Sequence, residues 1–348
     1  MFLSRSVVAS AILIPTLVFA GANPPQAPKK PHEITEVGHT RNDPFFWLRE
    51  KDNPEVLKYL EAENRYTESM LKHIGKLQET LYNEMRGRIQ ESDVSVPEKI
   101  DDYYYYSRTE TGKQYGMYCR KKGSLDAKEE VLLDENELAK GQKYFQIGTL
   151  SVSRDHKLLA YSTDTNGAET YLLRIKSLET GALLPDEIKN CSGSFAWAND
   201  NKTFFYDQLD DARRPYKALK HVLGTRVDQD PTVYEEKDAR FFLEISKSRN
   251  EKLIFVSVES ELSSEVRFLD ADRPDGELTL IRPRENDLLY EVENHGDRFF
   301  IVTNENAKNF KIIETPVASP GKEHWTDRAR CGGTRTEKLW RCGVTRGL

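Results

Sequence analysis

A short pattern of polar and hydrophobic residues recurs five times along this chain. Each copy is a polar turn rich in Asp, Asn, Gly and Lys, followed at once by a run of aromatic or aliphatic residues. The turns fall at Asp101, Asp155, Asp200, Asn250 and Gly296, so successive copies lie about 45–54 residues apart. Repeats of that length, built from strands and turns, are typical of β-propeller blades, which must stack on one another to bury their faces.

The hydrophobic run in each copy predicts one strand of each blade. The runs cover residues 103–106, 158–161, 203–206, 253–256 and 299–302. Between them lie further strand and turn signals, such as residues 169–175 followed by a hairpin turn at residues 179–181. Residues 93–326 therefore predict an all-β fold, a β-propeller of about five blades.

A different period precedes the blades. Asn53 and Pro54 form a helix start, and the apolar residues that follow recur at helical spacing. Residues 43–92 are therefore predicted to be an N-terminal helical segment, which can break into two helices at Gly75. Its apolar stripe must cover something apolar, either the flank of the propeller or a partner domain. The stripe is formed by Met70, Ile74, Leu77, Leu81 and Met85.

The first residues have the pattern of a targeting segment. Arg5 precedes an apolar run over residues 7–19, and Ala20-Gly21-Ala22 supplies the small residues of a cleavage site. Residues 1–22 are thus predicted to be a secretory signal peptide, with an uncleaved anchor as the alternative. The protein is then expected to be exported, periplasmic or secreted. Residues 23–42, which begin with four prolines over residues 24–31, are predicted to be an extended linker.

The end of the chain departs from this logic. Residues 327–348 show neither a helical nor a strand period and hold four glycines, five arginines and two cysteines. We interpret this tail as disordered or as sequence read in a shifted frame, with an unusual final loop as the alternative.

Composition narrows the classes of function. The chain has 348 residues, 31% of them charged, and a formal net charge of -6, so no basic surface for nucleic acid is expected. Four scattered cysteines are too few for a disulfide framework. Cys119 and Cys191 lie in or beside strand-like runs and are predicted to be buried thiols. The other two are Cys331 and Cys342.

A search for a hydrolase nucleophile finds none. The strand-turn-helix elbow requires G-x-S-x-G, and the nearest text, Cys191-Ser192-Gly193-Ser194, lacks the first Gly and precedes a strand. We interpret it as a simple turn.

Two groups of residues resemble metal sites, but neither has the spacing that a metal site needs. His32 and His39 lack the helical spacing of a zinc pair, because position 36 is Glu. Asp270, Asp272 and Asp275 resemble a calcium loop, but Pro274 displaces the third ligand and the twelfth position is Ile. No catalytic, cofactor-binding or metal-binding residue is therefore predicted, and no cofactor is expected.

Several segments, taken in order, resemble the prolyl oligopeptidase family of serine peptidases. They are DPFFWLR at residues 43–49, NPEV at 53–56, YLEAEN at 59–64, LLAYSTD at 158–164 and AWA at 196–198. The stretches at residues 104–110 and 112–120 resemble oligopeptidase B in particular, and the likeness extends over about residues 31–325.

The resemblance implies a seven-bladed propeller that caps a catalytic α/β-hydrolase domain, with the N-terminal helical segment packed on the hydrolase side. About five of seven blades are then present and the α/β-hydrolase domain is absent. The family's catalytic Ser, Asp and His belong to that domain, so none can be carried over. In the family the propeller acts as a filter that admits only short peptides to a buried site.

The expected function follows from this resemblance. The chain is expected to be the N-terminal propeller portion of an oligopeptidase B-like serine endopeptidase that cleaves short peptides after Arg or Lys, and to be inactive alone. The expected partners are short peptides, or a hydrolase domain supplied by another chain, with no nucleic acid and no membrane after signal cleavage. The alternatives are a stand-alone propeller that binds peptides or proteins and, more weakly, a structural propeller.

Overall fold

The structure of the protein, a computed structural model, describes residues 23–330. The chain divides into two compact units at Gln90 and Glu91, and each unit is considered by itself. The predicted signal peptide, residues 1–22, lies outside the described residues, as does the predicted tail from residue 331 on.

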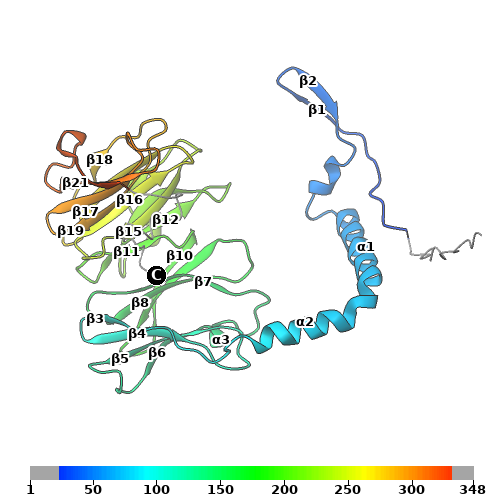
Figure 1. The fold of residues 1–348 in the computed structure, drawn as a ribbon, viewed down its shortest axis with the longest axis horizontal. Helices are drawn as coiled ribbons and strands as arrows, with labels where there is room; N and C mark the ends of the chain where they lie inside the picture. Colours follow the sequence, from blue (N-terminus) through cyan, green and yellow to red (C-terminus); the bar gives the residue numbers. More distant parts are fainter. Residues whose placement is uncertain (1–22, 331–348) are drawn as a thin grey trace, which may run out of the picture. The chain divides into compact units, whose positions relative to one another are not determined.

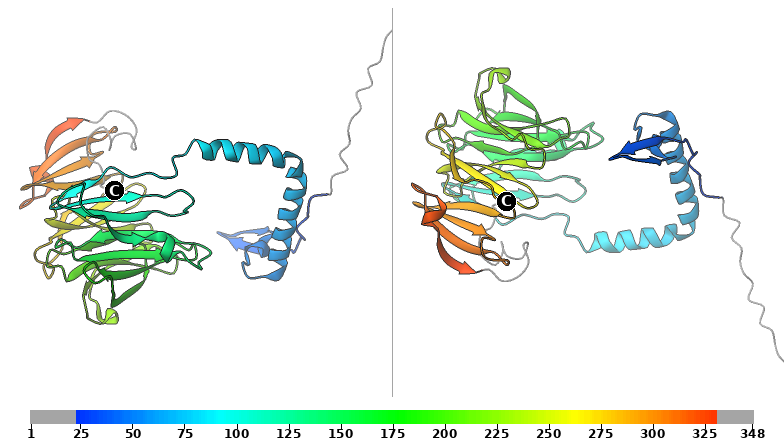
Figure 2. Two further views of the ribbon diagram at one scale, coloured as in Figure 1. Left: turned by 90° about the horizontal axis from the view of Figure 1, so that it is seen from below. Right: turned by 90° about the horizontal axis from the view of Figure 1, so that it is seen from above.

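The second unit consists of five four-stranded antiparallel sheets, each built from four consecutive strands (Figures 1 and 2). In the first, β3 (Glu98–Ile100), β4 (Tyr103–Arg108), β5 (Met117–Lys122) and β6 (Glu130–Asp134) pair in order, and the short helix α3 (Glu135–Leu138) follows. The second holds β7 (Gln146–Val152), β8 (Leu158–Asp164), β9 (Tyr171–Ser177) and β10 (Leu183–Cys191). The third holds β11 (Phe195–Trp197), β12 (Thr203–Leu209), β13 (Pro215–Val222) and, after the 3₁₀ turn η3 (Val227–Gln229), β14 (Thr232–Glu235).

The last two sheets repeat this plan. The fourth holds β15 (Phe242–Lys247), β16 (Leu253–Glu259), β17 (Ser264–Asp270) and β18 (Thr279–Arg282). The fifth holds β19 (Tyr290–His295), β20 (Arg298–Thr303), β21 (Lys311–Pro316) and, after η4 (Lys322–His324), β22 (Thr326–Arg330). The predicted all-β propeller fold is confirmed. Strand β22 places the first four residues of the predicted aberrant tail, 327–330, in the fifth blade.

The recurring turn of the sequence joins the first strand to the second in every blade. Each turn holds a residue with positive φ, a conformation that Gly, Asn and Asp tolerate best. Because the polar turn comes just before the second strand, the five hydrophobic runs predicted from the sequence are strands β4, β8, β12, β16 and β20. The left-handed residues are Asp101, His156, Asn201, Glu251 and Gly296.

Neighbouring blades bury their hydrophobic faces against each other. The joint between the second and third blades contains Ile175, Ile188, Trp197 and Phe204, all with at most 2% of their surface exposed. Similar clusters join the first blade to the second, the third to the fourth and the fourth to the fifth. Each fully buried side chain of this size contributes about 1.5–3 kcal/mol, so stacking is the main stabilising contact between blades.

Hydroxyl groups also fasten one blade to the next. The Ser194 hydroxyl, just before β11, donates to the carbonyl oxygen of Ile245 in β15 at 3.1 Å and accepts from the same residue's N–H. Ser264 in β17 repeats this arrangement with Tyr290 in β19, donating at 2.9 Å and accepting at 2.6 Å. One serine hydroxyl thus pairs with both the N–H and the C=O of one residue in the inner strand of the next blade. Such backbone groups need hydrogen-bond partners when they are buried.

The outer face of the first blade has a small cluster of its own. Tyr103 and Tyr105 in β4 face His156 of the second blade, so Tyr106 points to the opposite side. There it forms a buried cluster with Met117 and Cys119 in β5. Within residues 23–330, no buried cluster joins the fifth blade to the first.

The N-terminal unit begins with a hairpin rather than with an uninterrupted extended segment. Strands β1 (Glu33–Glu36) and β2 (His39–Asn42) pair through a two-residue turn, Val37-Gly38, in which both residues have positive φ. Such turns match the twist of a hairpin. The second half of the linker predicted over residues 23–42 therefore forms a hairpin in the structure.

Two helices complete this unit. After η1 (Phe46–Arg49) comes α1 (Pro54–Leu71), capped by the Asn53 side chain, which accepts from the Glu55 N–H at 2.9 Å. A 3₁₀ turn, η2 (Lys72–Ile74), then leads into α2 (Gly75–Gly87), so the predicted break falls at Gly75. Figure 1 shows the two helices running in different directions. No helix between residues 23 and 330 is long and apolar enough to cross a membrane.

The apolar stripe of these helices is not covered within its own unit. Leu77, Leu81 and Met85 are 54%, 46% and 61% exposed, and Trp47 and Val56 are the buried hydrophobic residues of this unit's described part. The stripe is thus available to another surface, as its sequence pattern indicates.

Candidate functional site

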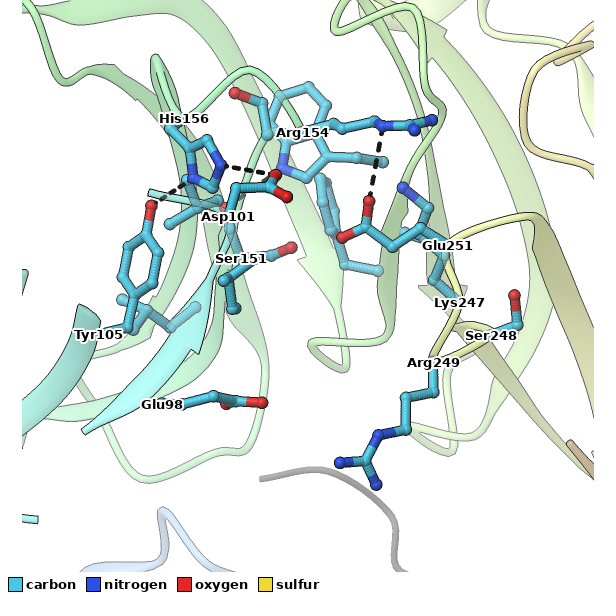
Figure 3. A pocket seen from close by; sticks show the side chains of 17 residues that line it. Glu98, Asp101, Tyr105, Ser151, Arg154, His156, Lys247, Ser248, Arg249 and Glu251 are labelled. Atoms are coloured by element: carbon cyan, nitrogen blue, oxygen red, sulfur yellow. Dashed lines mark hydrogen bonds and ion pairs between the residues drawn. The ribbon is translucent and has the colours of Figure 1, made fainter. Parts of the chain in front are cut away.

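The inner strands of the first four blades converge on a cavity of about 370 Å³. Its walls come from β3, β7, β11 and β15 and from the turns that follow three of them (Figure 3). Phe195, Trp197, Leu150 and Val152 supply apolar surface, and charged residues from the turns surround it. The Trp197 ring is held in place because its Nε1–H donates to the Ser151 carbonyl oxygen at 3.2 Å.

A hydrogen-bonded chain lies on the side of the first two blades. The Tyr105 hydroxyl lies 2.6 Å from Nδ1 of His156, whose Nε2 lies 3.2 Å from the Asp101 carboxylate (Figure 3). Arg120 donates to the His156 carbonyl oxygen at 2.6 Å and fixes the turn from behind. Burial raises the pKa of Tyr105, so its hydroxyl stays protonated.

Cations of the second and fourth blades lie on the other side. The half-buried Lys247 ammonium donates to the neutral Asn199 amide oxygen at 2.7 Å. Desolvation lowers the pKa of Lys247. Arg154 makes long ion pairs of 3.8 Å with Glu251 and 3.7 Å with Asp272.

Arg249 extends from the turn after β15, and Glu98 projects from β3 on the facing side of the cavity (Figure 3). Within the part of the chain that the structure describes, neither side chain has an ion-pair partner. The cavity therefore carries charged side chains of both signs, with Glu98 on one wall and Arg249 on the facing wall.

The serine-rich turn interpreted from the sequence as non-catalytic has a structural role. The Ser192 N–H donates to both oxygens of Asp207 at 3.0 and 3.2 Å, and Ser194 fastens β11 to β15. Asp207 is fully buried, and desolvation raises its pKa to about 6. These residues lie outside the cavity lining.

The other candidate residues are dispersed. His32 stacks on Phe46 with ring centroids 3.9 Å apart, whereas His39 lies in β2. Asp272 accepts from Asn199, and Asp275 pairs with Lys220. Within residues 23–330, no three His, Cys, Asp or Glu side chains are placed to hold a metal ion.

The predicted thiols are confirmed. Cys119 and Cys191 are free and buried, with pKa values raised by desolvation to about 11 and about 12. Cys331 and Cys342 lie outside the described residues.

The sequence did not single out the cavity residues. One sequence feature could have pointed to the cavity. Arg154 and Arg249 occupy the same position in two copies of the repeat, directly before Asp155 and Asn250. Equivalent positions of successive blades lie around one axis, so both arginines reach the same cavity.

Five consecutive four-stranded sheets with a cavity among their inner strands define this chain as a β-propeller protein. A sequence profile described as "Prolyl oligopeptidase, N-terminal beta-propeller domain" matches residues 25–329. The chain therefore belongs to the prolyl oligopeptidase family, of which it holds the N-terminal propeller portion.

Named relatives agree with this assignment. Dipeptidyl aminopeptidase BI from Pseudoxanthomonas mexicana is 40% identical over 94% of this chain and 48% of its own length. Protease 2 from Moraxella lacunata is 38% identical over 84% of this chain and 44% of its own length. The chain spans about half the length of the curated relatives it matches.

Solved structures give the same result. Oligopeptidase B from Leishmania major matches with a TM-score of 0.82 at 29% identity, over 88% of this chain and 46% of that protein. Oligopeptidase B from Trypanosoma brucei, in a closed form with covalently bound antipain, matches with a TM-score of 0.81 at 29% identity. It covers 89% of this chain and 48% of that protein.

Proposed function

We propose that this chain forms the propeller portion of an oligopeptidase B-like serine endopeptidase that cleaves short peptides after Arg or Lys. The observation that carries the proposal is a cavity enclosed by the inner strands of a propeller that superimposes on oligopeptidase B. In this role the propeller selects short peptides, while the catalytic Ser, Asp and His belong to a hydrolase domain. The exposed stripe of α1 and α2 packs on that domain.

By the same proposal, the 348 residues alone do not hydrolyse peptides. Two of the three cavity serines serve other partners, since the Ser153 hydroxyl donates to Asp155 and the Ser248 hydroxyl to Asn250. Acyl transfer needs a nucleophile activated by a neighbouring base and an oxyanion hole. The purified chain is assayed with fluorogenic peptides that carry Arg or Lys at the cleaved bond. Turnover that is blocked by a serine-directed reagent bound to this chain contradicts the proposal.

The selecting role is tested with a chimaera. Residues 25–329 replace the matching segment of Leishmania major oligopeptidase B, with dipeptidyl aminopeptidase BI as a second acceptor. We expect a folded chimaera to cleave short Arg or Lys peptides and to spare casein, because a closed propeller excludes large substrates. A folded chimaera that degrades casein as readily as short peptides contradicts the filter. One that prefers Leu at the cleaved bond contradicts the Arg/Lys specificity.

We also propose that the protein is exported, with residues 1–22 removed as a signal peptide. The support is the apolar run that ends at Ala20-Gly21-Ala22. N-terminal sequencing of exported material is expected to begin at Asn23. An intact Met1 on exported protein would show that the segment is retained as an anchor.

A further inference from the structure

A histidine lies between two carboxylates in the joint between the second and third blades. His221 of β13 is fully buried, and the side chains of Asp186 in β10 and Asp230 before β14 are 2% and 3% exposed. Nε2 of His221 lies 2.9 Å from Oδ1 of Asp186, and Nδ1 lies 2.8 and 2.9 Å from the two oxygens of Asp230. Both ring nitrogens therefore face a carboxylate oxygen at hydrogen-bond distance.

These distances determine where protons lie. A neutral imidazole carries one N–H, so its second nitrogen presents a lone pair, which a carboxylate oxygen at hydrogen-bond distance repels. A proton is therefore needed on both sides of the ring. It belongs to the imidazole rather than to a carboxylic acid, because neutral donors already stabilise both carboxylates as anions. The Gly224 N–H donates to Asp186 at 2.6 Å, and the Tyr206 hydroxyl donates to Asp230 at 2.9 Å.

The other groups around the ring supply no positive charge. Within residues 23–330, neither carboxylate pairs with a Lys or Arg, and Oδ2 of Asp186 is buried without a hydrogen-bond partner. The Phe204 ring, whose centroid lies 5.0 Å from that of His221, is uncharged. Burial raises the pKa of Tyr206 and that of Cys191, so both stay neutral. The imidazole is thus the group that can balance two buried negative charges.

We propose that His221 is an imidazolium in the folded protein and forms a pH-dependent link between the second and third blades. While both ring nitrogens carry protons, the ring donates to Asp186 of the second blade and to Asp230 of its own blade. Loss of one proton replaces one of these hydrogen bonds by a lone pair that faces a buried carboxylate, and this weakens the joint. That joint also contains Trp197, which lines the cavity.

The direction of the pH effect follows from the proton that the folded state holds. In an unfolded chain an imidazole loses its proton near pH 6.5. The stabilisation by the link is therefore complete below about pH 6.5 and is lost as the pH rises through the value at which the folded cluster releases its proton. This device is independent of the proposed peptidase function.

Long-range ¹H–¹⁵N correlation spectra of the full chain, labelled at the histidine nitrogens, test the protonation state. At pH 7.5, about one unit above the ordinary value, we expect both ring nitrogens of His221 to carry protons that exchange slowly with water. Absence of this signal from His221→Gln assigns it. If that variant does not fold, slow exchange assigns it, because His221 is the one buried histidine of residues 23–330. An unprotonated ring nitrogen at this pH overturns the inference.

Two variants test the link between the blades. Asp186→Asn removes one carboxylate with little change of shape, so its His221 is expected to lose the second proton at pH 7.5. Its urea midpoint is expected to fall less than that of wild type as the pH rises from 6.5 to 9.5. Asp228→Asn is the matched control, because Asp228 is an exposed aspartate of η3, two residues from Asp230. It is expected to behave as wild type does in both measurements. Equal pH dependence of wild type and Asp186→Asn overturns the inference, as does an equal effect of both substitutions.

Discussion

Asp207 shows how a single buried charge couples this fold to pH. Its carboxylate lies on β12, fully buried, with the Ser192 N–H as partner of both oxygens. Hydrogen bonds lower its pKa, but desolvation outweighs them and raises it from 3.8 to about 6. The folded state therefore holds the proton more tightly than the unfolded state does.

This shift predicts the direction of a pH effect. The stabilisation from the bound proton is complete below pH 3.8 and is lost as pH rises to about 6, a change of about 3 kcal/mol. In Asp207→Asn the neutral amide replaces the protonated acid. We therefore expect the unfolding free energy of the variant, relative to wild type, to increase by about 3 kcal/mol over that range.

Urea unfolding at a series of pH values between 3.5 and 7 measures this difference. Asp228→Asn is the control, since the exposed Asp228 pairs with Arg226, which lowers its pKa. Its effect is expected at pH values below 3.8, where that carboxylate titrates. A constant difference between wild type and Asp207→Asn from pH 4 to 6 would show that the folded carboxylate titrates normally.

Among the elements, strands were easier to foresee than the surface they enclose. A polar turn followed by apolar residues is a local signal, so β8 and β16 were readable from the sequence. The inner strands β3 and β11 have three residues each, too few to show a period. The cavity forms because residues far apart in the sequence, such as Glu98 and Lys247, come together from separate blades. No local sequence pattern indicates that such residues will meet.

The N-terminal helices provide a prediction at this scale. Leu81 and Met85 of α2 are exposed within their unit, so Leu81→Lys with Met85→Lys removes apolar surface without opening a core. We expect higher solubility and an unchanged melting temperature. Val56→Lys is the contrast, because Val56 is 4% exposed and a buried charge at that position should destabilise the unit.

Static light scattering against concentration and a thermal melt measure the two properties. If the double variant unfolds at a lower temperature than wild type, the stripe is covered in the isolated chain, and the proposed docking on a hydrolase domain loses its support.

At the scale of the whole molecule, self-association depends on the outer faces of the first and fifth blades. Val131 of β6, on the same face as Cys119, is 45% exposed. Stacked blades normally cover such positions, and uncovered apolar faces favour association. We expect the isolated chain to self-associate at micromolar concentration, and Val131→Lys to reduce the associated fraction.

Val222→Lys is the matched control, because Val222 is 39% exposed at the end of β13, in the third blade, which has a neighbour on both sides. Sedimentation velocity of the three proteins decides the matter. A strictly monomeric wild type, or equal effects of both substitutions, would show that the outer face of the first blade does not mediate association.

Each sheet uses only consecutive strands, and this has a consequence for synthesis. Because no described blade borrows a strand from a distant part of the chain, its hydrogen-bond ladder is complete once about 50 residues have left the ribosome. The hydrogen bonds between blades form later, because Ser194 can bond to Ile245, and Ser264 to Tyr290, only after the next blade has been synthesised. The nascent chain can therefore fold from its N-terminus onward, one blade at a time. Each new blade packs on the one before it, and the serine hydrogen bonds between the two then form.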